Sequence, residues 1–231
     1  MRFDIVTVYP EMLEPFFSFG VLWAAQKKGL IRIQLHNLRV FSPDPRGIVD
    51  DRPYGGGAGM VMRPEPFFRA VDAITREIGR KPYVILLSAQ GKLFRQEMAR
   101  ELAHKGALTL LCGRYDGVDE RVAKMADLEL SIGDYVLAGG ELAAAVVVEA
   151  VARMVPGVVG RYQSVVTDSF FQGPRLGYPQ YTRPRRFRGM EVPEVLLSGN
   201  HERIARFREV EAWKKTLRHR PDLLGLNLED P

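Results

Sequence analysis

Two nearly continuous apolar segments constrain the fold of this chain most. Residues 83–87 (Tyr-Val-Ile-Leu-Leu) and 108–112 (Leu-Thr-Leu-Leu-Cys) are each followed by a turn that contains glycine. Segments of this length and composition are typical of strands covered on both faces, as in a parallel sheet flanked by helices. Between them, Phe94, Met98 and Leu102 recur at helical spacing, so we expect a helix to connect the two strands.

The same alternation extends over the first two thirds of the chain. We expect strands at residues 3–9, 31–35, 83–87, 108–112 and 128–132, and helices at 18–28, 64–78, 94–105, 118–125 and 141–155. Ser18 is expected to cap the first helix. The apolar stripe of the last helix is expected to contain Leu142, Val146, Ala150, Val151 and Met154. The predicted fold class is α/β, with a mostly parallel sheet and helices on both faces.

The composition limits the classes of protein to which the chain can belong. Its 231 residues are 46% hydrophobic, which is enough for a substantial core. No apolar segment reaches the ~18–20 residues that span a bilayer, and Asp4 interrupts the apolar start, so we expect no targeting segment. The single cysteine, Cys112, favours a reducing compartment. We therefore expect a cytoplasmic protein in which Cys112 is an inert, buried thiol.

The last third of the chain has a different composition. Residues 156–184 are rich in glycine and proline, and we predict a flexible interdomain linker there. Residues 183–220 carry 11 Lys and Arg against 5 Asp and Glu. A helix capped by Asn200 is expected, and its apolar face is expected to contain Ile204, Phe207, Val210, Trp213 and Leu217. Such a basic segment suits a nucleic acid, and a solvated helical face is the alternative.

Three loops with small residues follow three of the predicted strands. They are residues 88–91, 113–117 and 131–142, the last with glycines at 133, 139 and 140. Ligands of parallel sheets bind outside the carboxyl ends of the strands, so we expect the three loops to share one pocket. Asp134 and Glu141 bracket the third loop, which favours a neutral or cationic small molecule over a phosphate. The alternative is that the glycines only form turns.

A polar loop at residues 41–63 contains four glycines within residues 55–59. A structureless loop of ~20 residues is uncommon and is often functional. No Lys-Ser or Lys-Thr follows its last glycine, so it is not a phosphate-binding Walker loop. We interpret it as a substrate-facing loop, with a surface excursion as the alternative.

Five motifs appear in the order known from one enzyme family. They are residues 50–57 (Asp-Asp-Arg-Pro-Tyr-Gly-Gly-Gly), 112–115 (Cys-Gly-Arg-Tyr), 119–121 (Asp-Glu-Arg), 131–137 (Ser-Ile-Gly-Asp-Tyr-Val-Leu) and 181–184 (Tyr-Thr-Arg-Pro). Together they resemble the bacterial tRNA (guanine-N1)-methyltransferases of the SPOUT class, from Ile5 to about Leu223. Departures are small: Ala89 and Ala143 stand where the family usually has proline, and Asp116 where it usually has glutamate.

The resemblance implies an activity and its partners. It implies S-adenosylmethionine (AdoMet) as methyl donor, N1 of the guanosine immediately 3′ of the tRNA anticodon as acceptor, and assistance by Mg²⁺. It implies a homodimer with the active site at the interface and a sheet threaded into a deep trefoil knot. The predicted organisation is then an AdoMet-binding knotted domain at 1–155, the linker at 156–184 and a basic helical tRNA-binding domain at 185–231. A related rRNA methyltransferase and a non-catalytic RNA-binding protein are the alternatives.

The resemblance also assigns residues. It implies that Asp168 is the base that removes the N1 proton and that Arg153 stabilises the charge that develops on the guanine oxygen. By themselves, these residues would be interpreted as a turn cap and as a cation at a helix C-terminus. The implied donor-binding residues are Leu86, Leu87, Ser88, Gly113, Tyr115, Asp116, Ile132, Gly133, Asp134, Tyr135, Val136, Leu137, Gly139 and Gly140. The implied substrate-binding residues are Tyr54, Gly55, Gly56, Gly57, Gly59 and Arg183, and no metal ligand is predicted.

Overall fold

The computed structural model describes residues 1–160 and 165–226 and divides the chain into two compact units, Met1–Gly160 and Arg161–Pro231. Four residues of the predicted linker and the last five of the predicted C-terminal domain lie outside the described residues. The strands of the first unit are β1 (Arg2–Thr7), β2 (Arg32–Asn37), β3 (Asp50–Asp51), β4 (Val61–Met62), β5 (Tyr83–Leu93), β6 (Ala107–Cys112) and β7 (Leu128–Ser131). Its helices are α1 (Glu14–Phe17), α2 (Gly20–Lys27), α3 (Pro64–Ile78), α4 (Gln96–Ala103), α5 (Glu120–Met125) and α6 (Glu141–Ala152), with 3₁₀ helices η1 (Pro10–Met12) and η2 (Leu38–Phe41).

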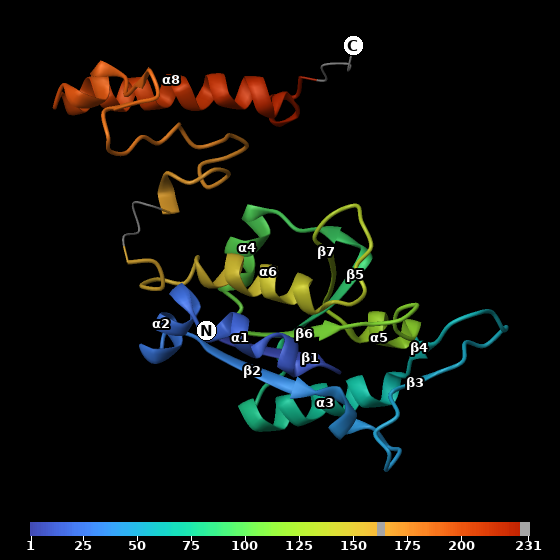
Figure 1. Cartoon of the computed structure of the whole chain (residues 1–231). Coiled ribbons are helices and arrows are strands. Elements are labelled where there is room, and N and C mark those ends of the chain that lie inside the picture. Colours follow the sequence, from blue (N-terminus) through green and yellow to red (C-terminus); the bar gives the residue numbers. More distant parts are fainter. Residues whose placement is uncertain (161–164, 227–231) are drawn as a thin grey trace. The chain divides into compact units, whose positions relative to one another are not determined.

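The core of the first unit is a parallel sheet, which confirms the α/β prediction. Its strand order is β2-β1-β6-β5-β7, and all four neighbouring pairs are parallel (Figure 1). β6 lies at the centre and is buried along its whole length. Because β6, β5 and β7 are neighbours, their carboxyl ends open at one edge of the sheet.

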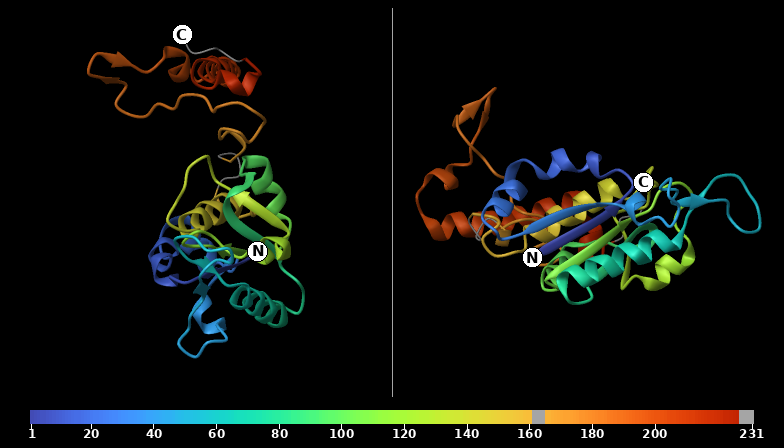
Figure 2. Two further views of the ribbon diagram at one scale, coloured as in Figure 1. Left: turned by 90° about the vertical axis from the view of Figure 1, so that its right-hand side faces the viewer. Right: turned by 90° about the horizontal axis from the view of Figure 1, so that it is seen from below.

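Helices cover both faces of this sheet. One core contains side chains of α2, α4 and α6 packed on one face, and a second contains those of α3 and α5 packed on the other. The right-hand view of Figure 2 shows α3 along one face of the strands. Strands covered on both sides must be apolar on both sides, which explains why the segments at 83–87 and 108–112 lack alternation.

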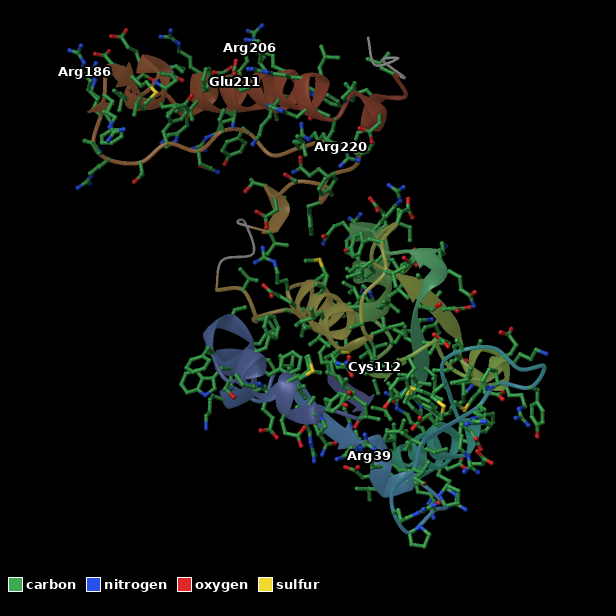
Figure 3. The ribbon with its side chains drawn as sticks, turned by 45° about the vertical axis from the view of Figure 1, so that its right-hand side comes forward. Arg39, Cys112, Arg186, Arg206, Glu211 and Arg220 are labelled. Atoms are coloured by element: carbon green, nitrogen blue, oxygen red, sulfur yellow. The ribbon has the colours of Figure 1, made fainter. Side chains whose placement is uncertain are left out.

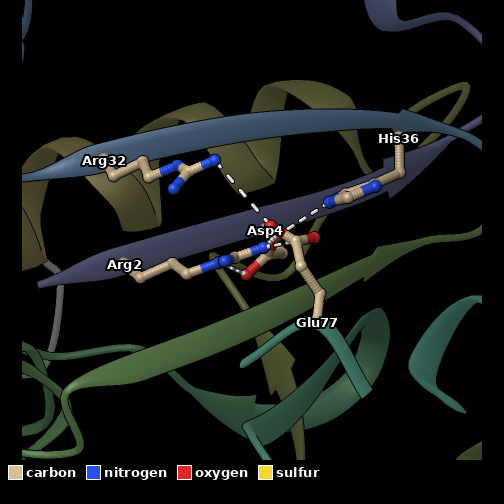
Figure 4. A network of polar contacts seen from close by, with 5 residues as sticks. All are labelled: Arg2, Asp4, Arg32, His36 and Glu77. Atoms are coloured by element: carbon tan, nitrogen blue, oxygen red, sulfur yellow. Dashed lines mark hydrogen bonds and ion pairs between the residues drawn. The ribbon is translucent and has the colours of Figure 1, made fainter. Parts of the chain in front are cut away.

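A polar network interrupts the second core beneath α3. Asp4 on β1 is fully buried and pairs with Arg2 and His36, each at 2.8 Å. Arg2 also reaches Glu77 at the end of α3, 2.9 Å away (Figure 4). Burial by itself raises the pKa of Asp4, but hydrogen bonds from His36 and Arg2 outweigh burial and bring this pKa below its ordinary value.

Three local expectations were wrong. Ser18 does not cap the first helix: its hydroxyl donates to the carbonyl of Glu14, and α2 begins after Phe19. Residues 88–91 do not end their strand, since β5 continues to Leu93 after a shift in its pairing with β7. The loop at 41–63 is not wholly irregular, because β3 and β4 pair in antiparallel fashion within it.

The buried face of α6 agrees only in part with the prediction. Val151 is buried as expected, whereas Leu142 is 58% and Val146 48% exposed. The helix instead buries Ala143–Ala145, Val147, Val148 and Ala152. The helix is apolar on all sides, so periodicity does not define which side faces the core.

The second unit contains one long helix and short elements beside it. These are β8 (Arg186–Phe187), β9 (Met190–Glu191), η3 (Glu194–Leu197), α8 (His201–His219) and η4 (Pro221–Leu224). Asn200 caps α8, since its side chain accepts from the backbone N–H of Arg203, 3.0 Å away. Arg186, Arg206 and Arg220 are distributed along the length of this unit in Figure 3.

The predicted apolar face of α8 is only in part its buried face. Ile204 and Phe207 are half-buried, whereas Trp213 is 46% and Leu217 50% exposed. The buried residues are Ala212 and Thr216, which the helical spacing of large apolar residues did not indicate. In the described ranges 1–160 and 165–226, no helix combines the length and apolarity needed to cross a membrane.

Candidate methyl-donor pocket

A cavity of about 680 Å³ lies at the carboxyl ends of β6 and β7 and beside the middle of β5. The loops after β6 and β7 line it together with residues 86–90 of β5, so the three segments expected to share a pocket do so, although the first of them belongs to a strand. A volume in this range is typical of sites for cofactor-sized molecules. The lining residues are Leu86–Gln90, Gly113–Val118, Glu120, Ala123, Glu129–Gly133, Tyr135–Gly140 and Ala143.

Two of these loops meet at the start of α6. The backbone N–H of Gly140 donates to the carbonyl of Gly113 at 3.0 Å, and Arg114 forms a β-bridge with Gly139. A Cβ atom at Gly140 would lie only 2.9 Å from the Cα atom of Cys112, which is closer than such contacts allow. Gly140 is therefore required by the close approach of α6 to the end of β6.

A buried carboxylate fixes the wall formed by Arg114. Glu141, 1% exposed, accepts from the hydroxyl of Thr7 at 2.6 Å and from Nε of Arg114 at 3.1 Å. The guanidinium of Arg114 also lies over the ring of Tyr9, 4.5 Å from its centroid, and its Nη2 is 3.1 Å from the sulfur of Met12. Glu141 thus joins the end of β1, the loop after β6 and the first turn of α6.

Three acidic residues, Asp116, Glu120 and Glu129, line the same cavity. In the part of the chain that the structure describes, Arg114 pairs with Glu141 and Arg121 pairs with Asp119. The two arginines that are near Asp116 and Glu120 in the sequence are therefore paired with other carboxylates. Three acidic groups make the cavity better suited to a cationic guest than to a phosphate.

Almost every implied donor-binding residue lines the cavity. Asp134 is the exception, since the lining of the third loop passes from Gly133 to Tyr135. Cys112 lies just behind the cavity, and burial, with the charge of Glu141, raises the pKa of its thiol well above the ordinary value. It is therefore held as a neutral thiol, in agreement with the predicted inert role.

The implied substrate-binding residues lie outside the cavity lining. Tyr54 is fully exposed, and the glycines at 55, 56 and 57 have no atom within contact range of a Cβ. The end of this loop nevertheless reaches the cavity rim: Met60 accepts from the backbone N–H of Asp116 at 3.1 Å, and a Cβ at Gly59 would overlap the carboxylate of Asp116. Arg183 belongs to the second unit and is exposed.

The implied catalytic pair is divided between the two units. Arg153 follows the last residue of α6, is partly exposed, and donates its backbone N–H to Glu149 at 3.1 Å. Asp168 is exposed in the second unit and lines a small hollow there of about 40 Å³. In the described ranges, no group of three or more His, Cys, Asp and Glu side chains could hold a metal ion, so we derive no step through Mg²⁺.

Sequence reasoning missed the network of Thr7, Glu141 and Arg114. Thr7 and Glu141 are 134 residues apart, so no local spacing connects them. The available signal was an acidic residue in the first turn of a helix after two glycines, a pattern that by itself indicates only a favourable helix terminus.

A cavity at the ends of adjacent parallel strands, walled by glycine loops, is typical of α/β enzymes that bind a small molecule. A family model described as tRNA (Guanine-1)-methyltransferase TrmD matches residues 1–226. The chain belongs to this family of enzymes.

Curated relatives agree over nearly the whole chain. A protein of Dictyoglomus turgidum is 56% identical over 224 residues, which cover 97% of this chain and 90% of that protein. A protein of Thermotoga maritima is 52% identical over 223 residues, 96% of this chain and 90% of its own. A protein of a Sulfurihydrogenibium species is 50% identical over 233 residues, 100% of this chain and 91% of its own. All three are named tRNA (guanine-N(1)-)-methyltransferase.

Proposed function

We propose that this enzyme transfers a methyl group from AdoMet to N1 of the guanosine immediately 3′ of the tRNA anticodon. The observation that carries the proposal is the cavity beside β5 and at the ends of β6 and β7, lined by two glycine loops, by residues 86–90 of β5 and by three carboxylates. Family membership supports the reaction class.

The residues present fit a methyl donor. Loop backbones offer N–H and C=O groups to polar parts of the guest, and Leu86, Ile132 and Leu137 offer apolar surface to an adenine ring. Asp116 and Glu120 are placed to favour the positive charge of a sulfonium. When bound, AdoMet supplies a methyl group that is electrophilic without a metal ion.

The acceptor requires a base and a cation. N1 of guanine carries a proton and is a poor nucleophile until that proton is removed. We assign Asp168 as the base that accepts the N1 proton while N1 bonds to the methyl carbon and the carbon–sulfur bond breaks. We assign Arg153 to stabilise the negative charge that develops on the guanine oxygen. Binding of tRNA would bring Asp168 to the target base.

Transfer of labelled methyl to purified tRNA and, in parallel, to purified rRNA, followed by mapping of the modified base, tests the function. Label at the guanosine 3′ of the anticodon supports the proposal. Label on rRNA alone would indicate a related rRNA methyltransferase, and RNA binding without any transfer would indicate a non-catalytic RNA-binding protein.

Substitution of Asp168 tests the assignment of the base. Asp168→Ala is expected to keep donor affinity and to lose at least ~100-fold in methylation rate, the usual scale of acid–base catalysis. Near-normal methylation by this variant in a single turnover would refute the assignment.

Exposed apolar side chains support the implied homodimer. On the first unit, Met12, Phe19 and Trp23 are 51%, 74% and 47% exposed. Leu142 and Val146 of α6 are also exposed, and Arg114 links the two groups by touching both Met12 and Glu141. Apolar surface of this kind marks an interface, and we propose a second copy as its partner, with the active site at the interface. The β-bridge between Arg114 and Gly139 is compatible with a threaded, knotted chain in this region, which we also propose.

The basic second unit supports a nucleic-acid partner. We propose that residues 183–220 contact phosphates of the anticodon arm and that the glycine loop around Tyr54 faces the tRNA. Binding should then weaken steeply with salt, because each phosphate contact releases counterions. We propose the cytoplasm as the compartment.

A further inference from the structure

The loop that carries Asp168, residues 165–178, is a closed structure in the described part of the chain. The backbone N–H of Asp168 donates to the carbonyl of Val165 at 3.2 Å, and that of Phe170 donates to the carbonyl of Arg175 at 2.8 Å. The N–H of Gly177 donates to the hydroxyl of Ser169, 2.9 Å away. These bonds tie both ends of the loop to the residues that flank Asp168.

One side chain of α8 anchors this loop. Thr216 is fully buried on a helix that is otherwise mostly exposed. Its hydroxyl accepts from the backbone N–H of Leu176 at 2.9 Å and donates to the carbonyl of Ala212 at 2.8 Å. Both hydrogen-bonding roles of the hydroxyl are therefore satisfied, and the bond to Leu176 joins α8 to the loop.

Thr216 is one of several contacts between this part of the unit and the 165–178 loop. Ala212 and Thr216 are the buried residues of α8 and stand one turn apart. Ala212, Leu176 and Asp168 line the same small hollow. Arginines and aromatic rings pair on either side of it: Arg208 with Tyr178 at 4.8 Å, Arg175 with Trp213 at 5.7 Å and Arg220 with Phe170 at 6.0 Å.

We infer that Thr216 is a positioning residue: its hydroxyl holds the loop at Leu176 and thereby places the carboxylate of Asp168 for proton removal. The inference rests on the proposed role of Asp168 as base. α8 then controls the chemical step through one buried hydroxyl, in addition to any contact that this helix makes with tRNA. A threonine is suited to this role because its hydroxyl can donate within the helix and still accept from a second backbone group.

The test uses the full-length enzyme with Thr216→Val, Thr216→Ser, Asp168→Asn and the double variant Thr216→Val/Asp168→Asn. Thr216→Val keeps the size of the side chain and removes the hydroxyl, whereas Thr216→Ser keeps the hydroxyl. Single-turnover methylation is measured at saturating tRNA and AdoMet, with AdoMet affinity measured by calorimetry. Thr216→Val is expected to lower the rate at least ~10-fold with AdoMet affinity unchanged, because small misplacements of a catalytic group are costly. Thr216→Ser is expected to restore the rate to within about threefold.

The double variant separates positioning from general structural support. If Thr216 acts through Asp168, Thr216→Val causes little further loss once Asp168 is Asn. An equal loss in both backgrounds, or a Thr216→Val rate within twofold of wild type, overturns the inference. Near-wild-type methylation by Asp168→Asn would instead overturn the assignment of the base, and the inference with it. If circular dichroism shows that the Thr216→Val variant is not folded, Thr216→Cys replaces it in the same comparisons.

Discussion

Two buried threonines offer a matched test of the donor-pocket wall. Thr7 on β1 and Thr109 on β6 are both fully buried in neighbouring strands. The hydroxyl of Thr7 donates to Glu141 at 2.6 Å and accepts from the backbone N–H of Tyr9 at 3.0 Å. The hydroxyl of Thr109 has no hydrogen-bond partner among residues 1–160 and 165–226. Replacement by valine removes the hydroxyl at each site without a change in size.

The expected effects have opposite signs. At Thr7, the change removes one hydrogen bond to a buried carboxylate, about 1.5–3 kcal/mol, and one to a partly buried N–H, about 0.5–1.5 kcal/mol. Thr7→Val should therefore lower the free energy of unfolding by roughly 2–4 kcal/mol, or a Tm loss of about 4–16 °C for a chain of this length. Thr109→Val removes a buried hydroxyl that lacks a partner, so it should be neutral or stabilise the fold by about 1–3 kcal/mol.

Chemical denaturation of both variants in parallel measures these differences. Thr7→Ser is the control, since it keeps the hydroxyl and should lose only about 1 kcal/mol from the missing methyl group. Calorimetry should also show weaker AdoMet binding for Thr7→Val than for Thr109→Val, because only Thr7 supports Glu141 and Arg114. Equal unfolding free energies for the two valine variants would refute the reasoning.

Three further outcomes are expected. Gly140→Ala places a Cβ against the backbone of β6 and should weaken AdoMet binding by at least ~5-fold in calorimetry, which corresponds to about 1 kcal/mol or more of overpacking. Unchanged affinity would contradict the close approach. Gly160→Ala, where a Cβ meets no atom within 4 Å, is the control. The pKa of Asp4 is lowered in the folded state, so its contribution to stability is present above its ordinary pKa and is lost as pH falls through the folded value. Asp4→Asn should cost roughly 3–5 kcal/mol near pH 7 and flatten the acid limb of the stability curve, and an unchanged acid limb in denaturant titrations would count against this. Leu142→Glu should shift the protein towards monomer in analytical ultracentrifugation, and an unaltered dimer would exclude this residue from the interface.

The sequence predicted the sheet well because its strands are covered on both faces. The apolar segments at 83–87 and 108–112 could not be stable elsewhere, and the helices between them dictated parallel pairing. The extension of β5 beyond Leu87 was not predictable in the same way. Residues 88–92 are each small or polar, and the pairing of Lys92 and Leu93 follows from a shifted register with β7. Register depends on long-range contacts that local patterns do not contain.

Helix faces were predicted less well, for two different reasons. α6 is apolar on every side, so its sequence could not distinguish the core from Leu142 and Val146. In α8, the largest apolar residues are exposed and the contact with the 165–178 loop uses Ala212 and Thr216. A contact made by a small residue and a hydroxyl leaves almost no hydrophobic signal in a sequence.

The pocket could be located from the sequence, but its chemistry could not. The predicted strand ends and the glycines that follow them indicated that three segments share one cavity. The roles of Asp168 and Arg153, in contrast, came from the family resemblance. As isolated residues, both have ordinary structural interpretations. The network around Glu141 required the three-dimensional structure, since its members come from three distant segments.

Arg114 has a consequence for the thermodynamics of the enzyme. It lines the donor pocket and touches Tyr9 and Met12 on the exposed apolar surface. A molecule that moves Arg114 at one of these places changes the free energy of binding at the other, and thermodynamic linkage makes this coupling reciprocal. In the proposed homodimer, the factor by which AdoMet strengthens the association of two copies must equal the factor by which association strengthens the binding of AdoMet. Measurement of the dissociation constant of that dimer with and without AdoMet would therefore also report how strongly assembly tightens the pocket.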